Sequence, residues 1–165
     1  VGGAAADFFT TSEGTARLFG GGGGDSFRLS EGEVDARGGG GADIFDVNLE
    51  GDVSAVIRGG AGADRFEFEA DRGRGDIAAG TIRIIDFKGG QGDRLAFGQV
   101  DAKIADFVLS RLVFIGADRF SGDGGELRYV QRSGVMSMDI DADGAADISI
   151  FFARGTVIQE DQIFL

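Results

Sequence analysis

A nine-residue pattern recurs four times in the first half of the chain and constrains the fold more than any other feature. Its form is Gly-Gly-x-Gly-x-Asp-x-apolar-x, and its copies begin at residues 2, 20, 38 and 59. The first copy is degenerate, because Ala5 stands where the third glycine belongs. Glycines in the first six residues permit backbone angles that a Cβ would block, so each copy predicts a turn followed by a short strand.

The spacing of the copies predicts how they stack. Successive copies start 18, 18 and 21 residues apart, which is two nonapeptides per coil with three extra residues in the last. Residues one coil apart then lie in register, about 4.8 Å apart on neighbouring strands. We expect the three extra residues to bulge near 47–58. The stacking predicts a column of acids, Asp7, Asp25, Asp43 and Asp64, and an inward column of aromatic residues, Phe9, Phe27, Phe45 and Phe66.

The acidic column predicts a bound cation. Carboxylates stacked at strand spacing repel one another unless cations lie between them. Calcium suits such gaps because it accepts six to eight oxygen ligands in loose geometry. We expect calcium on one side of the coil only, since the alternate half-turns lack the full pattern. Those half-turns carry Glu-Gly pairs, which we assign to turn formation, and they place Leu18, Ala36 and Ile57 at the inward strand position.

Composition excludes several classes of chemistry. Among 165 residues there are 28 acidic and 16 basic side chains, with no cysteine and no histidine. These absences exclude disulfides, thiol nucleophiles, cysteine-based zinc sites and imidazole catalysis. The net charge of −12 argues against nucleic acid and anionic lipid as partners, and no run of about 18 apolar residues exists that would span a membrane.

Two alternatives would account for the glycine tracts without metal. One is a glycine-rich linker and the other is a plain parallel β-solenoid. The 15 phenylalanines and the hydrophobic fraction of 42% argue against a disordered linker. Aspartates in phase with phenylalanines favour the metal-bound coil over both alternatives.

The repeats resemble the RTX (repeats-in-toxin) calcium-binding β-roll. The resemblance implies that each ion lies between two successive turns on the same side, held by both aspartates and by main-chain carbonyls. For the ion between Asp25 and Asp43, the implied carbonyls are those of Gly20, Gly22, Gly39 and Gly41. The implied metal-site residues within the repeats are Asp7, Gly20, Gly21, Gly22, Gly23, Asp25, Gly38, Gly39, Gly40, Gly41, Asp43, Gly59, Gly60, Ala61, Gly62 and Asp64.

The segment 82–97 resembles the strand–turn–strand that closes the roll in the serralysin C-terminal domain. Asp86 and Asp93 match two acidic positions of that unit, which implies that they complete the last calcium site. The segment departs from the family pattern, because its turn is one residue longer and Ala96 stands where a second aspartate is usual. Turn capping is the alternative role for both acids.

The last third of the chain also resembles the serralysin C-terminal domain, through Phe-Ser-Gly-Asp-Gly-Gly-Glu-Leu-Arg-Tyr at 120–129. We expect antiparallel strands at 126–131, 135–140 and 148–152, and a short amphipathic helix within 100–112. The acidic run 139–147 resembles the opening of an EF-hand loop but has Ile150 at position twelve, so a hairpin turn is favoured over a weak calcium site. The end of the chain, 160–165, resembles a type I secretion signal, and a final buried strand would have the same pattern.

These patterns predict an all-β protein: a right-handed parallel β-roll (a β-helix-like solenoid) over residues 1–97, capped by an antiparallel β-sandwich over residues 98–165. We expect a calcium-binding C-terminal module of a secreted, extracellular bacterial protein, cut from a longer chain. It would fold on calcium binding after type I export and stabilise its parent. Its expected partners are calcium ions, the type I secretion apparatus and the N-terminal domain of the parent protein.

Two other functions remain open from the sequence. One is an adhesive or carbohydrate-binding module in which calcium is only structural. The other is a self-contained enzyme using acid pairs such as Asp139 and Asp141. We favour a non-catalytic module, because charged turns explain those acids better.

Overall fold

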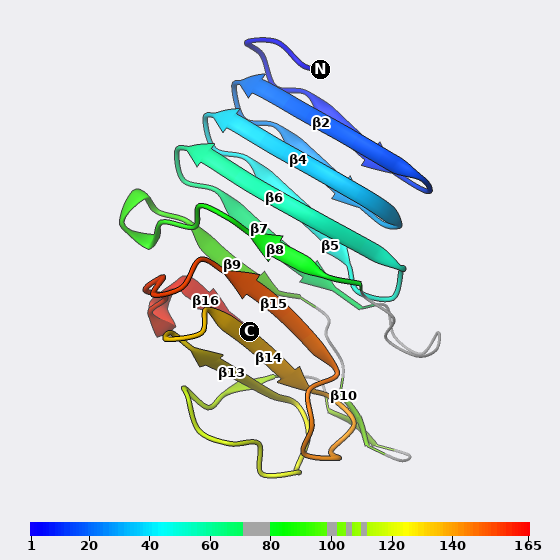
Figure 1. Cartoon of the computed structure of the whole chain (residues 1–165), viewed down its shortest axis with the longest axis vertical. Coiled ribbons are helices and arrows are strands. Elements are labelled where there is room, and N and C mark those ends of the chain that lie inside the picture. The colour runs from blue at the N-terminus through cyan, green and yellow to red at the C-terminus, as the bar shows by residue number, and fades with distance from the viewer. Residues whose placement is uncertain (71–79, 99–101, 105–106, 110–111) are drawn as a thin grey trace.

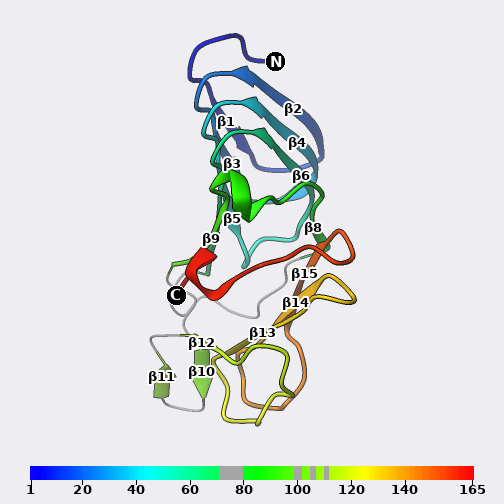
Figure 2. The ribbon, with the colours of Figure 1, turned by 90° about the vertical axis from the view of Figure 1, so that its left-hand side faces the viewer.

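The computed structural model describes residues 1–70, 80–98, 102–104, 107–109 and 112–165. Within them the chain is all-β, with short 3-10 turns at Gly89–Gln91 and Glu160–Gln162. It winds into stacked flat coils, and each coil contributes one strand to each of two facing sheets (Figures 1 and 2). No helix in the described part of the chain has the length and apolar character that crossing a membrane requires.

One sheet has six strands in the order β1-β3-β5-β7-β9-β16. Every neighbouring pair in it is parallel. Its strands are β1 (Phe8–Thr11), β3 (Ser26–Leu29), β5 (Ile44–Asn48), β7 (Arg65–Glu69), β9 (Arg94–Phe97) and β16 (Ile163–Phe164).

The second sheet has eight strands in the order β12-β13-β14-β15-β8-β6-β4-β2. Its N-terminal half is parallel, and its C-terminal part contains the antiparallel series β13-β14-β15. Its strands are β2 (Thr15–Gly22), β4 (Gly32–Gly40), β6 (Val53–Ala61), β8 (Ile82–Ile84), β12 (Val113–Phe114), β13 (Glu126–Val130), β14 (Val135–Asp139) and β15 (Ile148–Phe152).

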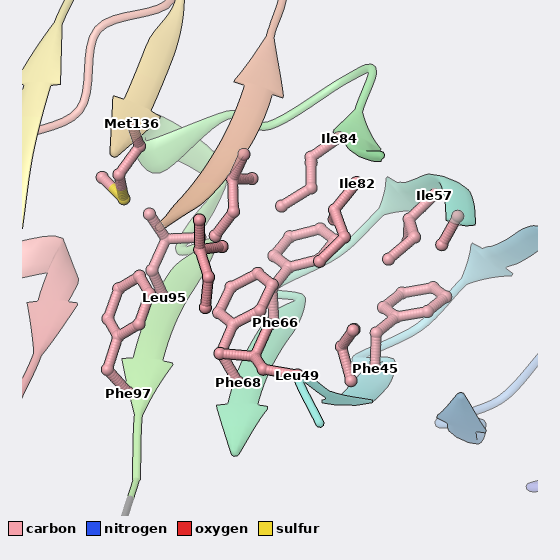
Figure 3. Close-up of a cluster of buried hydrophobic side chains, with 14 of the residues drawn as sticks. Phe45, Leu49, Ile57, Phe66, Phe68, Ile82, Ile84, Leu95, Phe97 and Met136 are labelled. Carbon is pink, nitrogen blue, oxygen red and sulfur yellow. The ribbon is translucent and has the colours of Figure 1, made fainter. Parts of the chain in front are cut away.

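The strand register confirms the predicted columns. Phe9 aligns with Phe27, Phe27 with Phe45, and Phe45 with Phe66. Their rings stack at centroid distances of 4.9, 4.7 and 5.3 Å. The inward alignment of Leu18, Ala36 and Ile57 on the opposite sheet is also confirmed, and Figure 3 shows Phe45 and Phe66 facing Ile57 and Ile82 across the core.

The three extra residues of the last step lie in the connection between β5 and β6. Leu29 aligns with Val47, one regular step along the chain, whereas Gly32 aligns with Val53. The insertion is therefore contained between these two pairs, within the predicted range of 47–58. The coil absorbs it at a turn, so the register of both sheets is preserved.

The C-terminal third continues both sheets of the roll. The predicted meander is confirmed, since β13, β14 and β15 pair antiparallel. Strand β15 then pairs parallel with β8, and β16 pairs parallel with β9. Residues from the C-terminal part of the chain thus close one end of the roll. The boundary between two domains at residue 97 stays a prediction.

The helix expected within 100–112 is wrong for the described residues. Strands β10 (Ala102–Ile104) and β11 (Phe107–Leu109) pair antiparallel there instead. Short apolar runs fit a helix and a strand equally well, and β-branched and aromatic residues favour the strand. Residues 99–101, 105–106 and 110–111, including Val100 of the predicted apolar series, lie outside the described residues.

Tyr129 joins the meander to the segment that follows β15. Its hydroxyl donates to the carbonyl of Thr156 at 2.7 Å, and its ring meets Phe152 edge-on at 5.7 Å. We expect Tyr129→Phe to lower the free energy of unfolding by about 1 kcal/mol, because the Thr156 carbonyl loses its donor. Urea unfolding measures this, with Ser133→Ala at an exposed bond as the control. Equal effects of the two substitutions would contradict the assigned role of Tyr129.

Candidate metal-binding site

The acidic column lies along one edge of the roll, where each glycine turn leads into a strand of the six-stranded sheet. We call each aspartate, together with the glycine turn before it, one rung of the column. Asp25, Asp43 and Asp64 are 0%, 0% and 1% exposed, whereas Asp7, in the first rung, is partly exposed. Each aspartate follows its turn directly and precedes β3, β5 or β7. The repeat therefore brings buried carboxylates together on one side of the coil, as its spacing predicts.

In the three buried aspartates, one carboxylate oxygen accepts a hydrogen bond from the neighbouring rung. The main-chain N–H of Asp7 donates to Asp25 Oδ1, and that of Asp25 donates to Asp43 Oδ1, both at 2.8 Å. The same bond links Asp43 to Asp64 at 3.0 Å. This ladder fixes the orientation of the column, and no pattern in the sequence indicates it.

In the three buried aspartates, the other carboxylate oxygen has no hydrogen-bond donor. Among the described residues, the orphaned buried side-chain oxygens are Asp25 Oδ2, Asp43 Oδ2 and Asp64 Oδ2. A buried polar atom left without a partner costs about 1–3 kcal/mol, and more where it carries charge. The same atom, Oδ2, therefore lacks a hydrogen-bond donor in three successive rungs.

Each orphaned oxygen lies against a glycine, and a side chain at that glycine would overlap it. A Cβ on Gly20 would overlap Asp25 Oδ2 and lie 2.6 Å from the carbonyl oxygen of Gly38. A Cβ on Gly38 would overlap Asp43 Oδ2 and lie 2.7 Å from the carbonyl oxygen of Gly59. In both places a carboxylate oxygen and a main-chain carbonyl oxygen lie close to the same glycine Cα.

The first rung shares this arrangement in part. A Cβ on Gly2 would overlap both Asp7 Oδ2 and the carbonyl oxygen of Gly20, but Asp7 Oδ2 also accepts the N–H of Gly3 at 2.9 Å. Three oxygen pairs therefore occur, one in each gap between successive rungs. Converging oxygens are the donor set that a hard cation such as calcium prefers, so the residues present fit the ion.

The carbonyls beside the carboxylates differ in part from those that the resemblance implied. The carbonyl of Gly20, which the resemblance assigns to the ion between Asp25 and Asp43, lies one gap earlier, beside Asp7 Oδ2. Beside Asp25 the structure places the carbonyl of Gly38, whereas those of Gly39 and Gly41 point at Gly60 and Gly62 in the next rung. The glycines that face these carbonyls have φ of 102° and 136°, a region that disfavours side chains.

Asp93 extends the ladder by one rung. Its Oδ1 accepts the N–H of Asp64 at 3.1 Å, and its Oδ2 accepts the N–H of Lys88 at 2.7 Å. Asp86 accepts the N–H groups of Gly59 and Gly60 at 3.0 and 3.1 Å. Both acids cap turns in this way, and their part in the last metal site stays a prediction.

The environment of Asp64 raises its pKa. Burial is the main cause, and the neighbouring carboxylates Asp93, Asp43 and Asp86 add to it, so that the pKa of Asp64 lies at about 6. Burial also raises the pKa of Asp43 and of Asp93. Without a cation, Asp43, Asp64 and Asp93 therefore keep their protons to a higher pH in the folded state than in the unfolded chain.

These pKa shifts predict how the stability of the calcium-free protein depends on pH. Between the ordinary value of 3.8 and about 6, folded Asp64 keeps a proton that the unfolded chain releases. The free energy of unfolding should therefore fall as pH rises through this window, by up to about 1.4 kcal/mol per pH unit for one carboxyl. Urea unfolding in a calcium chelator between pH 4 and 7 measures it. Asp64→Asn should flatten the dependence, and an unchanged slope would contradict the prediction.

A second acidic group lies in the turn between β14 and β15. Asp139, Asp141 and Asp147 each place one carboxylate oxygen within 4.8 Å of the others. Asp139 accepts the N–H groups of Ala142 and Gly144, both at 3.0 Å, and Asp147 accepts that of Ile140 at 2.6 Å. The predicted hairpin turn is present, and these bonds to its own backbone account for its acids.

Fold and site together define an all-β protein with a parallel two-sheet roll and a buried acidic column. No protein-family model and no curated protein matches the chain. Among solved structures, it is similar to the AlgE6R3 subunit of the Azotobacter vinelandii mannuronan C5-epimerase. The sequences are 20% identical, the match covers 99% of this chain and 80% of that chain, and the TM-score is 0.40.

Proposed function

We propose that the chain is a calcium-binding module whose folding is linked to calcium. The observation that carries the proposal is the set of buried oxygens without donors at Asp25, Asp43 and Asp64, each beside a glycine. A cation beside each of these oxygens would neutralise the carboxylate, and beside Asp25 and Asp43 it would also coordinate the nearby carbonyl of Gly38 or Gly59. Since the unfolded chain has no such gaps, the ions would stabilise the folded state by mass action.

The charge and glycine content of the chain support linked folding. At low calcium, the net charge of −12 and the entropy cost of 31 glycines oppose the compact state. Extracellular calcium modules bind at about 10⁻⁴–10⁻³ M, which would leave the folded state of such a chain only marginally stable where calcium is scarce. We propose that it folds after export.

The remaining parts of the proposal rest on the resemblance to RTX rolls and serralysin C-terminal domains. They are the right-handed sense of the coil, a β-sandwich cap, type I export guided by residues 160–165, and an extracellular location. The module would be non-catalytic and would stabilise a parent protein through its N-terminal domain. Strand β16 shows that the last residues also serve the fold, by pairing with β9.

A calcium titration followed by far-ultraviolet circular dichroism tests the proposal. The β-sheet signal should increase cooperatively with a midpoint of about 10⁻⁴–10⁻³ M calcium. Sodium chloride and magnesium at matched ionic strength are the controls, because screening alone reduces the repulsion of the acidic chain. A signal independent of calcium, or sodium chloride acting as well as calcium, would reject linked folding.

A further inference from the structure

The N-terminal end of the roll presents the free edges of both sheets. Strand β1 ends the six-stranded sheet and β2 ends the eight-stranded sheet. Among the described residues, only Gly2 and Gly3 bond to the outer side of β2, through Gly2 N–H to the Phe19 carbonyl and Gly22 N–H to the Gly3 carbonyl, both at 2.7 Å. Figures 1 and 2 show this end uncovered, whereas β13–β15 continue the other end. Proteins usually protect such edges with charge, proline or bulges, and β1 (Phe-Phe-Thr-Thr) has none of these.

The apolar columns are incomplete at the same end. Phe9 and Leu18 are only partly buried, whereas Phe27 and Ala36, which follow them in their columns, are 1% and 0% exposed. Phe8 is 70% exposed on the outer side of β1. One face of the last core layer therefore meets solvent, where every inner layer meets another coil.

Gly3 carries the most specific sign of a missing neighbour. In the three later rungs, only glycine fits at the corresponding position, because a carbonyl oxygen of the preceding rung lies against it. A Cβ on Gly21 would overlap the carbonyl oxygen of Gly3, one on Gly39 that of Gly21, and one on Gly60 that of Gly39. A Cβ on Gly3 would have no heavy atom of the described residues within 4 Å, its chain neighbours aside.

Backbone conformation does not account for Gly3 either. Its φ is not positive, in contrast to Gly21, Gly39 and Gly60 with φ of 110°, 114° and 102°. Nothing in the described structure thus requires glycine at residue 3. A carbonyl oxygen placed over Gly3, as Gly3 places its own over Gly21, would require it.

The aspartate ladder has an open position at the same place. Each lower carboxylate accepts at Oδ1 the N–H of the aspartate one rung earlier, beginning with the bond from Asp7 to Asp25. A further rung would supply the corresponding N–H to Asp7 Oδ1. It would also bury the second face of the Phe9 ring.

We propose that β1 and β2 form an interaction surface for one further coil of the same two-nonapeptide construction, with a glycine-turn carbonyl over Gly3. The coil would add one parallel strand to each sheet. The proposal continues the contacts between existing rungs and does not depend on which ion, if any, the column binds.

The test adds such a coil to the whole chain. Residues 20–37 are duplicated directly before Gly2, and the control carries the same residues in scrambled order. With the true coil, the amides of β1 should exchange with solvent about tenfold more slowly or better, and Tm should rise by about 2–8 °C. Equal exchange and equal Tm in the two extended proteins would overturn the proposal.

Substitution of Gly3 sharpens the test, because its effect should depend on the added coil. In the unextended chain, Gly3→Ala should leave Tm unchanged, since the new methyl group meets no other residue. In the extended chain, it should abolish the gain. Gly21→Ala, which overlaps a carbonyl already present, should lower Tm in both proteins. If Gly3→Ala is neutral in both, the added coil does not lie over Gly3, and the proposal is wrong.

A second copy of the chain is the competing occupant. Two molecules could meet through their N-terminal ends, and sedimentation of the unextended chain over a range of concentrations detects this. We expect a monomer. A dimer that Phe8→Glu dissociates would assign the surface to a second copy and overturn the proposal. Neither exchange nor sedimentation measures calcium binding, so failure of the calcium proposal would be recognised separately.

Discussion

Replacing Asp43 by asparagine is expected to stabilise the calcium-free fold and at the same time to weaken its response to calcium. Asp43 is fully buried; its Oδ1 accepts the N–H of Asp25, and its Oδ2 has no donor. The amide of asparagine retains the Oδ1 acceptor and directs N–H groups toward the carbonyl of Gly59, so that two facing oxygens become a donor and an acceptor. A cation in this gap loses its charged ligand.

The expected sizes follow from these two effects. In chelator, Asp43→Asn should raise the free energy of unfolding by about 1–3 kcal/mol, the cost of the orphaned polar group that it removes. It should also raise the calcium midpoint by about tenfold or more, which corresponds to about 1.4 kcal/mol of lost binding. Asp43→Ala should also raise the calcium midpoint. It should not raise the free energy of unfolding in chelator, because it leaves the N–H of Asp25 without its acceptor.

Urea unfolding with and without calcium measures both effects. Asp52→Asn is the matched control, because it removes the same charge from an exposed aspartate outside the column. It should change neither quantity by more than about 0.5 kcal/mol. An Asp43→Asn protein that is less stable in chelator and responds fully to calcium would show that Oδ2 does not face a cation site.

Replacing Gly38 by alanine is expected to displace the carboxylate of Asp43 without altering any charge. The new methyl group would overlap Asp43 Oδ2 and lie 2.7 Å from the carbonyl oxygen of Gly59, two oxygens that are proposed to bind the cation. Gly38 does not have a positive φ, so the effect is steric alone. We expect a loss of about 3 kcal/mol or more in the free energy of unfolding, and a smaller calcium response.

Gly40 provides the matched control in the same turn. A Cβ there would have no heavy atom of the described residues within 4 Å, its chain neighbours aside, and its φ is not positive. Gly40→Ala should therefore alter stability and calcium response by less than about 1 kcal/mol. Thermal unfolding and calcium titration of both proteins compare them. Equal effects at the two positions would mean that space beside Asp43 Oδ2 is not what matters.

The sequence was sufficient to predict the coil, because the repeat period determines which residues align on neighbouring strands. Once Asp25 and Asp43 are one coil apart, parallel pairing aligns every residue between them, including Phe27 with Phe45. The meander from β13 to β15 was also predictable, since its three strands are local and separated by turn residues. The positions of the column acids follow from the same repeat.

Contacts between distant segments could not be predicted in this way. The parallel pairing of β16 with β9 joins residues far apart in the chain, and nothing in either strand specifies the partner. A second inward column was missed because all of its members lie outside the nine-residue copies; they are Leu29, Val47, Phe68 and Phe97. Which oxygen of each carboxylate is orphaned depends on atomic positions and is visible only in the structure.

Calcium-edge anomalous diffraction from crystals grown at saturating calcium tests the central claim most directly. We predict anomalous density in the gaps between rungs, beside the Oδ2 atoms of Asp25 and Asp43 and next to the Cα atoms of Gly20 and Gly38. Those gaps without density, in crystals whose roll has the fold described above, would contradict the account of the column as a metal-binding site.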